Sequence, residues 1–273
     1  MKRLLFLMLL SVIFLNAETT AEEYALFKRT ISPSMMWGED GLILVPKANT
    51  MGKGHIYLSS NVIDSGKVQG QEIYLTSATA MISTSEDVEL GYTRRVFMWD
   101  DGDYTNIKMD TYHLKARVFH LSDNYIPQMS VGVNLVSIAA NDFSDEKDIL
   151  YNPYVTLTIN APLFTDNAVL SLTACAEKVY NEQESTDVQF SGGADLILFK
   201  HLYLVGEVQG IDKDGQGGVV NFGAKVKIGW VSIGAGVFNL AREQVEGKDD
   251  ADTNKEYYMA NLAIELPFDK LFK

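Results

Sequence analysis

Residues 257–268 read YYMANLAIELPF, and every second side chain in most of this stretch is apolar. The apolar positions are Tyr258, Ala260, Leu262, Ile264 and Leu266, and the positions between them include Tyr257, Met259, Asn261 and Glu265. Successive side chains of a β-strand point to opposite faces. The alternation therefore predicts a strand with one apolar face and one mixed face.

The same period of two recurs along the rest of the chain, and no helical periodicity of similar clarity follows residue 17. Alternation and turn signals together predict about twelve strands, within a range of ten to fourteen. Their expected positions are residues 54–63, 71–83, 87–98, 107–120, 128–140, 150–160, 167–180, 186–198, 201–210, 218–228, 230–240 and 256–267. Most of these stretches have the length of a tilted strand that crosses a bilayer.

The second face of each predicted strand decides what the apolar face meets. That face is rich in Gly, Ser, Thr and Asn and carries few charges, unlike the solvent face of a soluble sheet. A closed ring of this many strands encloses more space than a packed core fills, and closure leaves no strand edge unpaired. We therefore expect an all-β fold, a closed antiparallel transmembrane β-barrel with its apolar face outward. A secreted two-layer β-sandwich is the alternative.

The N-terminus indicates export. Lys2 and Arg3 precede an apolar run from Leu4 to Leu15, and Ala17 is suited to be the last residue before cleavage, a pattern that resembles a secretory signal peptide. We expect a signal peptide at residues 1–17, a periplasmic leader at 18–53, the barrel at 54–268 and a C-terminal tail at 269–273. Predicted short connections alternate with long ones, which places short turns in the periplasm and long loops outside.

Charge and cysteine content limit the kinds of molecule that the protein is expected to bind. The net charge is −13 and there is one cysteine, so the sequence favours neither nucleic-acid binding nor a disulfide framework. Expected partners are outer-membrane lipid, lipopolysaccharide and small solutes.

Two segments resemble known families. The stretch Tyr258–Phe268 resembles the C-terminal targeting strand of Gram-negative outer-membrane β-barrels, which ends in an aromatic residue. Here Asp269–Lys273 follow that aromatic. The resemblance implies location in the cell outer membrane and recognition by the barrel-assembly machinery. Residues 38–60, GEDGLILVPKANTMGKGHIYLSS, are similar to the first segment of some barrels linked to exopolysaccharide export.

Alternation also predicts which charged side chains line the lumen. The predicted basic ones lie on two strands at opposite walls of the ring, and the acidic ones on the three strands from 167 to 210. The candidates are His113, Lys115, Arg117, Lys225 and Lys227 together with Glu177, Asp195 and Glu207. They would either create a field across an open pore or pair with one another in a plugged barrel, with Glu207 and Lys225 as a possible cross-strand pair.

The sequence motifs that could indicate catalysis or metal binding are incomplete. Asp212–Gly217 begins like a calcium loop, but Gly223 replaces the glutamate that an EF-hand requires. His120-Leu-Ser122 resembles a His-x-Ser of outer-membrane phospholipases, although the expected topology places it at the periplasmic end. We therefore expect no catalytic residues, cofactor or metal.

The sequence favours a porin-like channel for small polar or charged solutes. A plugged structural or surface-interaction barrel (envelope architecture or polysaccharide export) is the second reading, and an outer-membrane hydrolase the third.

Overall fold

The structure is a computed structural model that describes most of the chain from residue 41. The described residues are 41–68, 71–99, 107–119, 127–140, 148–163, 168–181, 185–199, 201–213, 215, 217–238 and 257–268. The expected signal peptide, the first part of the expected leader and all but one of the residues after Pro267 lie outside these ranges.

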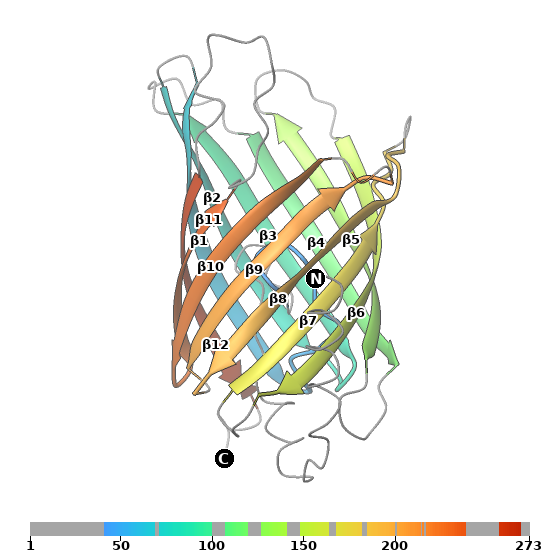
Figure 1. The fold of residues 1–273 in the computed structure, drawn as a ribbon. Helices are drawn as coiled ribbons and strands as arrows, with labels where there is room; N and C mark the ends of the chain where they lie inside the picture. Colours follow the sequence, from blue (N-terminus) through green and yellow to red (C-terminus); the bar gives the residue numbers. More distant parts are fainter. Residues whose placement is uncertain are drawn as a thin grey trace, which may run out of the picture.

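Twelve strands make up nearly all of the described chain, as Figure 1 shows. They are β1 (His55–Val68), β2 (Gln71–Ser83), β3 (Val88–Trp99), β4 (Ile107–Phe119), β5 (Gln128–Ala140), β6 (Asp148–Pro162), β7 (Ala168–Glu177), β8 (Gln189–Leu198), β9 (Leu202–Ile211), β10 (Gly217–Ile228), β11 (Val231–Phe238) and β12 (Tyr257–Pro267). Each strand overlaps one of the twelve stretches that the alternation predicts.

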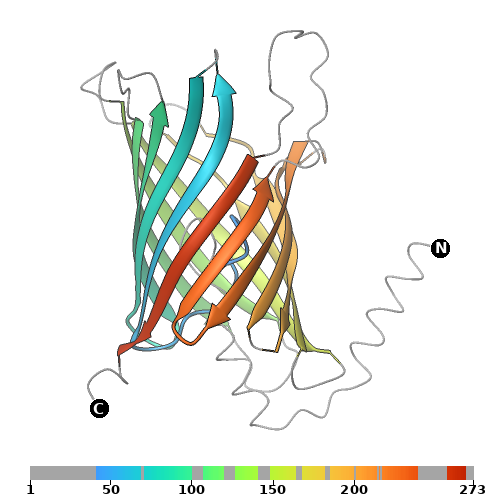
Figure 2. The same cartoon turned by 90° about the vertical axis from the view of Figure 1, so that its left-hand side faces the viewer.

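The strands form one closed barrel in which each pairs with its neighbours in the chain. Closure comes from the antiparallel pairing of β1 with β12, whose register runs from His55 opposite Pro267 to Asp64 opposite Tyr258. Figures 1 and 2 show the tilted strands arranged in a ring. The closed antiparallel fold that the sequence predicts is confirmed, and a two-layer sandwich is excluded.

The two faces of the barrel differ as the alternation predicts. On β1, Leu58 and Val62 are exposed on the outside, whereas Asn61 between them is buried inside. On β12, Leu262 is 52% exposed while Asn261 is 3% exposed. The barrel therefore presents its apolar side chains outward and its polar ones inward, the reverse of a soluble protein. Within the described residues, no helix is long and apolar enough to cross a membrane.

Candidate functional site

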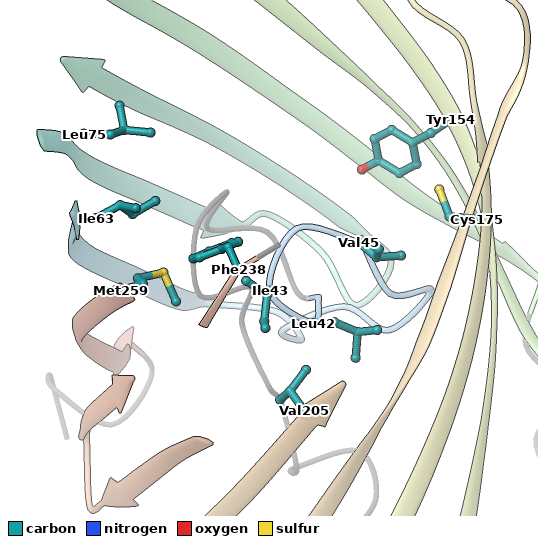
Figure 3. Close-up of a cluster of buried hydrophobic side chains, with 10 residues drawn as sticks. All are labelled: Leu42, Ile43, Val45, Ile63, Leu75, Tyr154, Cys175, Val205, Phe238 and Met259. Atoms are coloured by element: carbon teal, nitrogen blue, oxygen red, sulfur yellow. The ribbon is translucent and has the colours of Figure 1, made fainter. Parts of the chain in front are cut away.

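The interior of the barrel is occupied by residues 41–51, which we call the luminal segment. Apart from the half-buried Leu44, every residue of this segment is buried. It folds back on itself through a β-bridge between Gly41 and Pro46 and a hydrogen bond of 2.8 Å from Leu42 N to Val45 O. Figure 3 shows this loop inside the ring of strands. It belongs to residues 18–53, the range expected to be a periplasmic leader, and its position inside the barrel does not follow from the sequence pattern.

Two glycines connect the luminal segment to the wall. Gly52 has φ of 80° and Gly54 has φ of 78°, a region that glycine enters without steric cost. These two residues turn the chain from the interior into β1, which begins at His55.

The Glu207 carboxylate holds the first half of the segment. Its oxygens accept hydrogen bonds from the consecutive backbone N–H groups of Ile43, Leu44 and Val45 at 3.0–3.1 Å. Asn221 on β10 donates a further bond of 2.9 Å. Successive N–H groups that converge in this way form an anion-binding concavity. Glu207 therefore obtains its partners from the backbone of the segment and from one wall amide.

Lys47 holds the second half of the segment. Its Nζ lies 3.0 Å from Asp195 Oδ1 on β8 and donates a bond of 3.3 Å to Ser171 Oγ on β7. The side chains of Lys47 and Asp195 are both fully buried. A buried ion pair resists separation because removing either partner leaves an uncompensated charge.

A second buried ion pair, within the wall at β3 and β4, also bonds the segment. Lys115 Nζ lies 2.8 Å from Glu89 Oε2 and donates a bond of 3.3 Å to the Lys47 carbonyl. Glu89 in turn accepts a hydrogen bond from the Met51 N–H. The charged groups of β3 and β4 thus bind the backbone of the segment as well as each other.

Neutral contacts complete the polar attachment. Ala48 N donates to Thr158 Oγ1 at 2.9 Å, and Thr50 Oγ1 donates to the carbonyl of Glu86 at 2.6 Å. Glu86 lies in the short connection between β2 and β3, so the segment is also fixed at the end of the barrel where these two strands are joined.

Apolar side chains of the segment form a small core with the wall. The cluster comprises Leu42, Ile43, Val45, Ile63, Leu75, Tyr154, Cys175, Val205, Phe238 and Met259, drawn in Figure 3. Full burial of an aliphatic side chain stabilises by about 1.5–3 kcal/mol. Cys175, the single cysteine of the chain, lies in this core.

A glycine on the wall makes room for the core. A Cβ at Gly193 on β8 would lie 2.7 Å from Leu42 Cδ1, and 2.3 Å from the carbonyl oxygen of Gly206 on β9. Wall and segment are therefore fitted to each other in shape as well as in charge.

Of the eight candidate lumen residues, Lys115, Asp195 and Glu207 contact the segment, as described above. The other five bind wall groups. His113 is buried and bonds Thr93 and Asn134 at 2.9 and 2.8 Å. Arg117 pairs with Asp87 at 2.7 Å.

The remaining three candidates are Glu177, Lys225 and Lys227. Glu177 accepts a bond of 2.9 Å from Asn152, Lys225 Nζ lies 5.1 Å from the centre of the Tyr203 ring, and Lys227 pairs with Glu265. The register places Asn221, and not Lys225, opposite Glu207. This corrects the expectation that Glu207 and Lys225 are cross-strand partners.

Sequence reasoning missed Lys47, which pairs with the wall, and Glu89, which accepts a bond from the segment. One sequence signal was present before the first strand. Residues Leu42–Val45 are a continuous apolar run followed by Pro46, and they do not alternate as the strands do. In the described part of the chain, no group of three or more His, Cys, Asp or Glu side chains is placed to hold a metal ion.

The geometry defines a closed β-barrel with an apolar exterior and a chain segment fixed inside it. No protein-family model matches the sequence, and no curated protein does. Among solved structures, the chain is similar to the KdgM porin, with 12% identity, a TM-score of 0.51 and coverage of 76% of this chain and 98% of that one.

Two further structures are similar over most of their length. The outer membrane protein Omp33 of Acinetobacter baumannii has 8% identity, a TM-score of 0.46 and coverage of 78% of this chain and 99% of its own. LpxR from Salmonella typhimurium has 9% identity, a TM-score of 0.48 and coverage of 76% and 99%. The feature that this chain shares with the KdgM porin is the barrel fold.

Proposed function

We propose that this protein is an outer-membrane channel for small polar or charged solutes, held closed by its own luminal segment. The observation that carries the proposal is the attachment of residues 41–51 to the inside of the wall through Glu207, Asp195, Glu89 and Thr158. Export by the N-terminal signal and assembly through the C-terminal strand belong to the same proposal.

Placement in a membrane is supported by the outer surface. Large apolar side chains exposed on it include Ile233 at 63%, Leu262 at 52% and Phe222 at 54%. A surface of this kind is unfavourable in water and favourable against acyl chains. Closure of the ring satisfies the backbone hydrogen bonds that lipid cannot satisfy.

A conducting role is supported by the inner surface. Buried inward positions carry Ser, Thr and Asn, including Ser77, Thr79, Thr93, Thr111 and Asn134. Several of these groups bond one another in the closed barrel, as Thr79 and Thr93 do at 2.9 Å, and hydroxyl and amide groups of this kind suit the lining of a pore for polar solutes. The luminal segment covers part of that lining, so its position determines the free cross-section.

Conductance in planar bilayers tests the proposal. We expect the mature wild-type protein to show small or infrequent current steps, because the segment occupies the lumen. A variant that lacks residues 18–51 should show larger and steady steps. Glu207→Gln should open more often than wild type, since the neutral amide has one acceptor oxygen for the three N–H groups.

Glu177→Gln is the matched control, because Glu177 is a luminal carboxylate that binds Asn152 and Ser191 on the wall. It should behave as wild type. Equal conductance of the wild type and the truncated variant would contradict closure by the segment.

The second candidate function is a plugged structural barrel. The observation that favours it is the double attachment of the segment, by the buried ion pair of Lys47 with Asp195 and by an apolar core. In that case the truncated variant, folded and inserted, remains silent in the bilayer.

A further inference from the structure

We propose that the place where Lys47 meets the wall is a binding site for primary ammonium groups, and that the opened channel therefore favours amine-bearing cations. The inference rests on the proposed channel function and specifies the solutes of that channel. In the closed barrel, Lys47 occupies the site as an internal ligand.

The site has the geometry of an ammonium receptor. The Lys47 Nζ lies 3.0 Å from Asp195 Oδ1 and 3.3 Å from Oδ2, and 3.3 Å from Ser171 Oγ. An ammonium group has three N–H donors, and here a carboxylate and a hydroxyl receive it. In the closed barrel both charged side chains are fully buried, so bulk water does not weaken the interaction there.

The wall around the site becomes acidic when the segment leaves. Asp195 then loses Lys47, and Glu207 loses the three N–H groups of residues 43–45. Glu89 differs, because it keeps Lys115 at 2.8 Å. Two carboxylates on adjacent strands are thus left to attract a cation.

The wall near these carboxylates also carries a buried cation, Lys225. Lys225 on β10 lies over the ring of Tyr203 at 5.1 Å, and the register places it opposite Tyr203. Glu207 lies opposite Gly193 across β8 and β9. Because Gly193 has no side chain, Leu42 lies directly against the wall at this position, and its departure would uncover the wall beside Glu207.

Chemical rescue tests the site in the full-length protein. Lys47→Ala should open more often than wild type, because the segment loses its ion pair. Addition of n-butylammonium, which reproduces the lysine side chain, should restore closure. Butyrate, of the same length and opposite charge, should have no effect. Lys47→Ala combined with Asp195→Asn should lose the rescue by about tenfold or more in concentration, as expected for removal of a charged hydrogen-bond partner.

Lys47→Ala combined with Glu177→Gln is the matched control and should be rescued like Lys47→Ala alone. Should Lys47→Ala fail to fold, the variant that lacks residues 18–51 provides a second measurement. Its reversal potential in a salt gradient should show cation preference, reduced by Asp195→Asn and by Glu207→Gln.

The outcomes separate the two proposals. If the truncated variant inserts but does not conduct, the channel proposal is wrong. If it conducts without cation preference, and butylammonium neither rescues Lys47→Ala nor depends on Asp195, the ammonium site is wrong while the channel stands.

Discussion

Leu42 in the luminal segment lies directly in front of Gly193 in β8, with its Cδ1 2.7 Å from the position that a Cβ at residue 193 would occupy. The interior of the barrel is therefore complementary in shape to a segment of the same chain, because the Leu42 side chain lies where residue 193 has no side chain. This relationship leads to the first prediction.

Gly193→Ala should destabilise the closed barrel by about 1–3 kcal/mol, the usual cost of overpacking. The added methyl group meets the backbone of Gly206 and Glu207 as well as Leu42. Urea unfolding in lipid vesicles measures the change. Gly206→Ala is the control, because its methyl group meets only the Phe222 ring, at 3.0 Å. Equal stability of both variants would contradict the close fit at residue 193.

Lys47→Met should lower the free energy of unfolding by about 3–5 kcal/mol, since Asp195 is then buried without its cation. Lys47→Met combined with Asp195→Leu should regain most of this loss, because an apolar pair replaces the ion pair. Unfolding of the four members of this double-mutant cycle measures the coupling. Additive effects of the two substitutions would show that the 3.0 Å contact between them contributes little.

Leu262→Arg should destabilise the inserted barrel by about 2–4 kcal/mol, as expected for arginine on the lipid face near the middle of a strand. Leu262 lies midway along β12 and is 52% exposed on the outside. Tyr258→Arg, at the end of the same strand and 57% exposed, should cost about 1 kcal/mol or less. Equal costs at the two positions would argue against contact with a bilayer.

The native protein should migrate differently from the boiled protein in a detergent gel. The cause is the continuous ring of hydrogen bonds closed between β1 and β12, which detergent alone does not open. The protein should be recovered in the outer-membrane fraction. Its release as a dissolved protein after osmotic shock would end the membrane proposal.

The strands could be predicted from sequence because their signal is local. Alternation of Leu58, Val62 and Asn61 depends only on neighbours along the chain, and the wall of the barrel reproduces it. The inward position of His113 and Lys115 follows from the same period.

The luminal segment could not be predicted because its partners are distant in sequence. Ile43 and Glu207 are 164 residues apart, and Lys47 and Asp195 are 148 apart. The expected pairing of Glu207 with Lys225 was wrong for a related reason, since alternation gives the face of a residue but not its register across two strands.

The position of residues 41–51 also has a consequence for the order of biogenesis. This stretch leaves the ribosome before any strand, yet Thr158, Asp195 and Glu207 must arrive before it has anything to bind. Contacts across such sequence separations form late. The apolar side chains of Leu42, Ile43 and Val45 therefore stay uncovered until the wall residues that pack against them, including Val205 and Met259, have assembled into the barrel.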